Sequence, residues 1–195
     1  DAIGYEETLN SCKKSLERLS LDYVDLYLIH APPENISVRE DVWRGMEDIL
    51  ESGLSRSIGV SNYGPKHLEE LMKSSRYGPA VNQIELHPWL QRPHIIDATI
   101  SVGAVPMAYS PLARGHKVDD ETLSIISKNE GCTPAQACIK WCIDRGYITI
   151  PKSSNKDRIY ENLESLNITI SNKGRQALDD LEENYISGWD PTSEP

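Results

Sequence analysis

The stretch Tyr23-Val24-Asp25-Leu26-Tyr27-Leu28-Ile29-His30 decides the fold class of this chain. It is short, it is rich in aliphatic and aromatic residues, and Pro32-Pro33 stops it, which is typical of a buried strand. Apolar residues that recur three or four positions apart before it predict an amphipathic helix. They are Leu9, Cys12, Leu16 and Leu19. After the strand, the capping-box pattern Ser37-Val38-Arg39-Glu40 predicts a second helix that ends at Gly53.

The same alternation of strand and helix continues along the chain. Further strands are predicted at residues 57–60, 80–86, 104–109 and 147–150. Further helices are predicted at residues 65–74, 93–101, 119–129, 155–163 and 172–184, with another that begins at Thr133-Pro134-Ala135-Gln136. This order predicts right-handed βαβ units and a parallel sheet. No Gly-x-Gly-x-x-Gly pattern follows a strand and no Walker pattern is present, so the remaining common architecture is the (β/α)8 TIM barrel.

Composition excludes several classes of partner. The chain has 195 residues, which suggests one domain, and its formal net charge of -10 argues against nucleic acids and anionic membrane surfaces. There is no run of apolar residues long enough to cross a membrane, and four cysteines are too few for a disulfide-stapled domain. The first residues carry neither an initiator Met nor a signal peptide, so we expect a fragment or a processed product located in the cytoplasm.

Polar side chains gather at the C-terminal end of every predicted strand, where a β/α barrel carries its site. They are His30, Ser61, Asn62, Gln83, Glu85, His87, Tyr109, Ser110, Lys152, Ser153 and Ser154. The last group continues into a cluster of cations with Lys156 and Arg158, at the start of a helix whose N-terminus favours anions. This pattern predicts a site for a phosphate monoester, and its alternative is a solvated helix start. Histidines 67, 94 and 116 are expected at the surface.

Taken together, these motifs resemble those of the aldo-keto reductase family. The resemblance runs from about Gly4 to Pro191 and rests on five ordered motifs and on the tail. The motifs are Tyr23 to His30, Gly59-Val60-Ser61-Asn62, Asn82-Gln83-Ile84-Glu85-Leu86-His87-Pro88, Ala108-Tyr109-Ser110-Pro111-Leu112, Ile150-Pro151-Lys152-Ser153 and Gly188-Trp189-Asp190-Pro191.

The resemblance implies a TIM barrel that uses NADPH to reduce aldehydes and ketones, with one catalytic residue of the family's four in this chain. That residue is His30, which would donate a hydrogen bond that orients the carbonyl group. The family's catalytic Asp, Tyr and Lys come from earlier strands, so we expect the chain to carry about strands 4–8 and their helices. It would be a single partial barrel domain without its N-terminal third, and catalytically incomplete on its own.

The resemblance also implies a cofactor site and no metal. Hydroxyl and amide groups suit the nicotinamide carboxamide, an aromatic face suits its ring, and cations suit the 2′-phosphate that NADH lacks. The implied residues, from nicotinamide to adenine, are Ser61, Asn62, Gln83, Tyr109, Ser110, Leu112, Lys152, Ser153, Ser154, Arg158 and Asn162. Glu85 is expected to be structural and to hold loops at the mouth of the barrel.

Two other hypotheses remain open from the sequence. The chain could be a truncated, non-catalytic protein of this type with a binding or regulatory role. It could also be another β/α barrel enzyme that acts on a phosphorylated substrate, with the cations of residues 152–158 holding the substrate. The small carbonyl substrate and the oligomeric state are not predicted.

Overall fold

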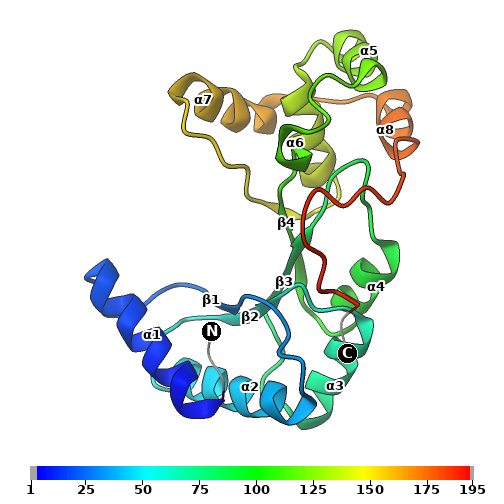
Figure 1. Cartoon of the computed structure of the whole chain (residues 1–195). Helices are drawn as coiled ribbons and strands as arrows, with labels where there is room; N and C mark the ends of the chain where they lie inside the picture. The colour runs from blue at the N-terminus through cyan, green and yellow to red at the C-terminus, as the bar shows by residue number, and fades with distance from the viewer. Residues whose placement is uncertain (1–3, 194–195) are drawn as a thin grey trace. The chain divides into compact units, whose positions relative to one another are not determined.

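A computed structural model describes residues 4–193 of the chain (Figure 1). The chain forms two compact units, which are described in turn: residues 1–83, 94–105 and 190–195 in the first, and residues 84–93 and 106–189 in the second. Five strands, all in parallel pairs where their register is defined, follow one another in the sheet in the order β1-β2-β3-β4-β5. The α/β class and the parallel sheet that the alternating pattern predicts are therefore confirmed.

The first unit packs four helices with three strands. Its elements are α1 (Tyr5–Leu19), β1 (Tyr27–Ile29), α2 (Ile36–Glu51), β2 (Ile58–Ser61), α3 (Pro65–Ser74), the start of β3 (Val81–Glu85) and α4 (Pro93–Ser101). Helices α1 and α2 lie side by side (Figure 1), and Gly45 permits this approach because a Cβ atom there would lie 3.0 Å from the Cβ atom of Thr8. The buried core of the unit includes Met46, Val60 and Leu68.

The second unit places helix α6 at its centre. Its elements are the end of β3, β4 (Val105–Tyr109), the 3₁₀ turn η1 (Ala113–Gly115), α5 (Glu121–Glu130), α6 (Pro134–Asp144), β5 (Ile148–Thr149), α7 (Lys156–Glu164), the 3₁₀ turn η2 (Ser165–Asn167) and α8 (Asn172–Asp179). Helix α6 contacts α5, α7 and α8, and Trp141 on it is therefore fully buried. The capping box predicted at the start of α6 is confirmed, because the side chains of Thr133 and Gln136 each bond the other's backbone N–H.

Three predictions of local structure are wrong. The strand predicted at residues 23–30 is the three-residue β1, and most of its side chains are only half-buried, because β1 pairs with β2 alone. Asn35, rather than Ser37, caps α2, since the Asn35 side chain accepts the backbone N–H of Ser37. Helix α8 ends at Asp179 instead of residue 184, and beyond its end the backbone N–H groups of Glu183 and Tyr185 donate to the carbonyl oxygen of Trp89.

One histidine also departs from expectation. His67 is buried rather than exposed, and its Nδ1 atom accepts the backbone N–H of Gly64 at 3.1 Å. This bond satisfies the first turn of α3, which Gly64 cannot cap with a side chain. His94 and His116 are exposed, as predicted. No helix among residues 4–193 combines the length and apolar character needed to span a bilayer.

Candidate active site

A cavity of about 690 Å³ lies within the second unit. Most of its lining comes from four stretches: the loop of residues 110–118 after β4, the first turn of α6, the chain that follows β5, and helix α7. Its apolar walls include Trp89, Leu123 and Ile150. The volume is in the range of small-molecule and cofactor sites, which run from about 300 to 1,000 Å³.

The loop of residues 110–118 holds a strained backbone. Ser110, Ala113 and Arg114 have φ angles of 48°, 47° and 54°, a left-handed region that non-glycine residues seldom adopt. Two short turns hold the loop, with the N–H groups of Ala113 and Gly115 donating to the carbonyl oxygens of Ser110 and Leu112 at 2.8 Å. Strain of this kind gathers at ligand-binding segments, because the surrounding structure must enforce it.

Cations outnumber acids in the lining of the cavity. Arg114, Lys117, Lys152 and Arg158 face a single carboxylate, Glu161. Lys117 is paired with Glu183, whereas neither Lys152 nor Arg158 forms an ion pair within the part of the chain that the structure describes. Gly115 and Lys117, which flank His116 in the sequence, line the same cavity as Lys152. The cavity is thus an electropositive site in a chain of net charge -10.

The start of α7 does not offer the free backbone N–H groups that an anion site at a helix N-terminus would use. The Asn155 side chain already accepts the N–H groups of Asp157 and Arg158, at 2.9 and 3.1 Å. These amides are therefore occupied, and the attraction for an anion rests on the side chains of Lys152 and Arg158. Lys156 is not part of the lining, since its ammonium group lies over the Tyr160 ring, 6.0 Å from the centroid.

Helices α6 and α7 are joined at the wall of the cavity. The Thr133 hydroxyl donates to the Glu161 carboxylate at 2.5 Å, and the Gln136 side-chain amide donates to the Glu161 carbonyl oxygen at 3.1 Å. Thr133 and Glu161 both line the cavity. The capping pattern identified Thr133 as a helix start, but the sequence carried no sign of its second bond to a residue on another helix.

The one cysteine in the lining is a poor nucleophile. Cys138 is 2% exposed, and burial raises the pKa of its thiol well above the ordinary value. Burial also raises the pKa of Cys142, one turn further along α6, to about 12. Both thiols therefore stay protonated near neutral pH, and a protonated thiol is a poor nucleophile. All four cysteines are free, as expected.

The structure divides the predicted site residues between the two units. Six of them line the cavity of the second unit: Ser110, Leu112, Lys152, Ser153, Arg158 and Asn162. Tyr109 and Ser154 belong to the same unit but are not among the lining residues. Residues that the sequence analysis did not assign to the site include Trp89, Arg114, Lys117, Thr133 and Glu161. Among residues 4–193, no group of three or more His, Cys, Asp or Glu side chains is arranged to hold a metal ion.

The remaining four predicted residues form a hydrogen-bonded group in the first unit. His30 is exposed at the end of β1, and its carbonyl oxygen accepts the Asn62 side-chain amide at 3.0 Å. The Ser61 hydroxyl and the Asn62 backbone N–H both donate to the carbonyl oxygen of Gln83, at 2.7 and 2.9 Å. Asn62 has a φ angle of 61°, so the chain turns sharply after β2. These bonds set the ends of three neighbouring strands in register.

Glu85 at the end of β3 is buried, with 1% of its surface exposed. Its Oε1 atom accepts three hydrogen bonds, from His87 Nε2 at 3.1 Å, from the Ser187 backbone N–H at 3.0 Å and from the Ser187 hydroxyl. Burial by itself would raise the pKa of Glu85, but the bonds from His87 and Ser187 outweigh it and hold that pKa below its usual range. Glu85 is therefore ionised, and its hydrogen bonds with Ser187 hold the C-terminal region in place.

Known proteins were compared with the chain as a whole. The Aldo/keto reductase family model matches residues 2–183. An uncharacterised oxidoreductase of Schizosaccharomyces pombe is 39% identical over 196 residues, covering 100% of this chain and 70% of that protein. Glyoxal reductase of Bacillus subtilis is 40% identical over 188 residues, covering 96% of this chain and 67% of that protein.

Solved structures give the same result. A mutant of Gox0644 in complex with NADPH has a TM-score of 0.93 and 33% identity, and the match covers 99% of this chain and 72% of that one. An aldo-keto reductase of Bombyx mori in complex with NADP has a TM-score of 0.87 and 33% identity, covering 96% of this chain and 66% of that one. Because the family model matches nearly the whole chain, it gives no support to the expectation of a C-terminal portion alone. On the strength of these matches, the chain belongs to the aldo/keto reductase family.

Proposed function

We propose that this protein is an NADPH-dependent oxidoreductase that reduces small aldehydes or ketones to alcohols. The observation that carries the proposal is the electropositive cavity of the second unit, in which four cations face one carboxylate. In a chain of net charge -10, such a concentration of cations favours a ligand with more than one anionic group.

The lining fits the phosphate-bearing part of the cofactor. Lys152 and Arg158 suit the 2′-phosphate, since both are charged and neither is engaged in an ion pair among residues 4–193. Ser110 and Leu112 suit the pyrophosphate, while Asn162 suits the adenine ring. The structural neighbours in complex with NADPH and NADP support this choice of ligand.

The reacting end of the site is assigned to the other predicted residues. In the proposal, Ser61, Asn62 and Gln83 bind the carboxamide, Tyr109 stacks on the nicotinamide ring, and Ser154 assists at the 2′-phosphate. His30 donates a hydrogen bond to the substrate oxygen as negative charge develops there. The bound cofactor supplies the hydride.

The proposal includes a limit on catalysis. The family resemblance assigns four catalytic residues and matches one of them, His30, to this chain, which would carry about strands 4–8 of a TIM barrel. A missing proton donor lowers the rate by about 10²- to 10⁴-fold. We therefore expect the chain by itself to bind NADPH and to oxidise it slowly with an aldehyde.

Titration of the chain with NADPH, followed by quenching of its four Trp residues, tests the cofactor assignment. Lys152→Ala combined with Arg158→Ala should weaken NADPH binding about tenfold or more and leave NADH binding nearly unchanged, because a hydrogen bond to a charged group contributes about 1.5–3 kcal/mol. Lys156→Ala is the matched control, since Lys156 lies over Tyr160 and outside the lining. Equal losses for both cofactors would rule out a 2′-phosphate site.

The competing hypotheses give different results in the same assay. A non-catalytic relative with a binding role would bind NADPH and show no aldehyde-dependent oxidation even at high enzyme concentration. A barrel enzyme for a phosphorylated substrate would show no quenching by NADPH.

A further inference from the structure

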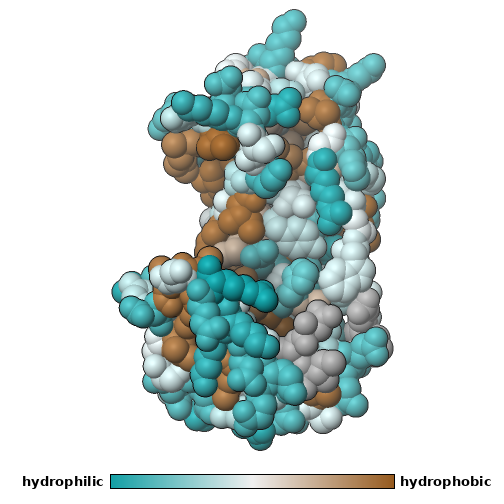
Figure 2. Space-filling model, turned by 60° about the vertical axis from the view of Figure 1, so that its left-hand side comes forward, coloured by the Kyte–Doolittle hydropathy of each residue, from teal (hydrophilic) through white to brown (hydrophobic). Residues whose placement is uncertain are grey.

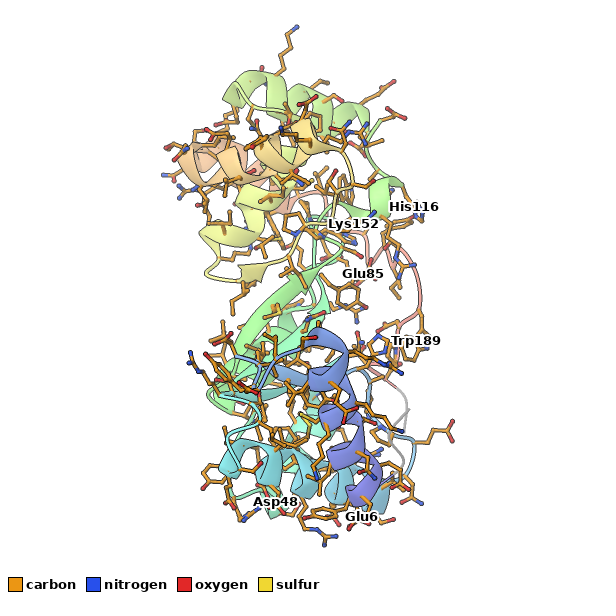
Figure 3. All side chains as sticks on the ribbon, turned by 90° about the vertical axis from the view of Figure 1, so that its left-hand side faces the viewer. Glu6, Asp48, Glu85, His116, Lys152 and Trp189 are labelled. Carbon is orange, nitrogen blue, oxygen red and sulfur yellow. The ribbon has the colours of Figure 1, made fainter. Side chains whose placement is uncertain are left out.

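Residues 182–188, here termed the C-terminal segment, run between the end of β3 and the loop of residues 110–118. All three stretches belong to the second unit, and Glu85 and His116 lie at the two sides of the segment (Figure 3). The segment contacts both the residues at the end of β3 and the loop of residues 110–118, and so links these two stretches physically.

On one side, the segment is tied to the residues that follow β3. The Ser187 backbone N–H and hydroxyl both donate to Glu85 Oε1. The backbone N–H groups of Tyr185 and Glu183 donate to the Trp89 carbonyl oxygen at 2.9 and 3.3 Å. Glu85 and Ser187 are 1% and 8% exposed, so water does not compete for these bonds.

On the other side, the segment touches the loop that lines the cavity. The Tyr185 hydroxyl lies 2.9 Å from His116 Nδ1, and the Lys117 ammonium lies 4.6 Å from the Tyr185 ring centroid. Lys117 also pairs with Glu183. At residue 188, a Cβ atom would come within 2.5 Å of the Arg114 guanidinium carbon, so glycine permits that close approach. The segment thus contacts Arg114 and Lys117, two residues of the lining.

We propose that Glu85 is a positioning residue for the cofactor loop. By holding Ser187, it fixes the C-terminal segment against residues 110–118 and so sets how tightly that loop retains the phosphates of NADPH. The left-handed backbone at Ser110, Ala113 and Arg114 needs such support, because strained conformations persist only where neighbours enforce them. The part that concerns NADPH rests on the proposed function.

The chain offers a control for Glu85 that has the same donors in a more exposed position. Glu130 accepts the same two donors from Ser171, its backbone N–H at 2.7 Å and its hydroxyl at 2.7 Å. This second pair joins the end of α5 to the start of α8, and neither residue lines the cavity. An effect on NADPH release or on amide exchange that appears in the Glu85 variant and not in the Glu130 variant therefore reports on the loop rather than on the general loss of a Glu–Ser bond.

Two measurements on the full chain test the proposal with Glu85→Gln, Ser187→Ala and Glu130→Gln. The first is the NADPH dissociation rate by stopped-flow fluorescence. We expect Glu85→Gln to release NADPH about tenfold faster, the change that about 1.4 kcal/mol produces. Ser187→Ala should change the rate in the same direction, and Glu130→Gln should match the unchanged chain even if its melting temperature falls equally.

The second measurement is hydrogen exchange of the Ala113 and Gly115 amides without any ligand. Glu85→Gln should accelerate it about tenfold and Glu130→Gln should not, because only the first loosens the support of the loop. Unchanged exchange in Glu85→Gln, or equal acceleration in both variants, overturns the proposal. Absence of NADPH binding by the unchanged chain would instead overturn the proposed function, and the exchange measurement would still decide the role of Glu85.

Discussion

The hydroxyl of Thr133 donates a 2.5 Å hydrogen bond to the carboxylate of Glu161, and both side chains line the cavity. Thr133 caps helix α6 and Glu161 lies on helix α7, so one side chain both starts a helix and orients the single acid of the site. This relationship makes the helix cap part of the ligand-binding geometry.

Thr133→Ala should weaken NADPH binding and lower stability together. Loss of a helix N-cap costs about 1 kcal/mol of unfolding free energy. We expect a reduction in NADPH affinity of about tenfold, because the charged Glu161 carboxylate loses the hydroxyl donor that orients it in the lining. Titration calorimetry and chemical denaturation measure the two effects. Thr133→Ser keeps the hydroxyl and should restore both, and an affinity that Thr133→Ala leaves unchanged would contradict the role of the cap in the site.

His30→Ala should lower turnover without lowering NADPH affinity. His30 is exposed at the end of β1, whereas the proposed phosphate-binding residues line a cavity in the second unit. Loss of one hydrogen bond to a developing oxyanion costs about 10²- to 10³-fold in rate. The residual oxidation of NADPH by a reactive aldehyde measures the first effect and fluorescence titration the second. Loss of NADPH binding with unchanged turnover per bound cofactor would show that the assignment is wrong.

Cysteine alkylation should be ordered by burial. Cys132 is half-buried and should react first with iodoacetamide, while Cys138 and Cys142 should react only as fast as the chain unfolds. The physical reason is that burial raises the pKa of both α6 thiols, and the thiolate is the reactive form. Mass spectrometry of timed samples checks the order. Rapid labelling of Cys138 in the native chain would contradict its buried environment.

The stability contributed by Glu85 should be lost in acid. Its folded pKa lies below the ordinary value of 4.5, so its contribution is complete above pH 4.5 and disappears as the pH falls through the lower, folded pKa. The difference in unfolding free energy between the unchanged chain and Glu85→Gln should therefore be constant near neutral pH and shrink in acid. Urea denaturation at a series of pH values measures it, and the other carboxylates cancel in the difference. A difference that grew in acid would have the wrong sign.

The outer strands of the described sheet should promote self-association. Strands β1 and β5 each pair with one neighbour, and Ile148 on β5 is 41% exposed. Apolar side chains reach the surface of both units (Figure 2), and an apolar strand edge is a site for pairing between chains. Ile148→Lys should shift the size distribution of the purified chain towards the monomer, as measured by light scattering. Ile125→Lys, on helix α5 and 61% exposed, is the control and should shift it less.

The alternation of strands and helices could be read from the sequence because local pattern controls it. Helices α3 and α4 match their predicted bounds at residues 65–74 and 93–101, since a proline starts each and an apolar stripe follows. The capping box at Thr133 was also visible, because all of its partners lie within four residues. The length and burial predicted for the strand at residues 23–30 were wrong. Its composition suits a buried strand, but the exposure of its side chains depends on which strands lie beside it.

The candidate site also combines features that the sequence predicted with features that only the structure shows. The sequence by itself determined the cations at Lys152 and Arg158, the polar residues after each strand and the family resemblance, because these depend on residue type and order. Only the tertiary structure decided that Glu161 is held by Thr133 and that Glu85 bonds Ser187, 102 residues away. Such contacts join positions far apart in the chain, and no local pattern of polarity specifies which distant partner a buried donor or acceptor will meet.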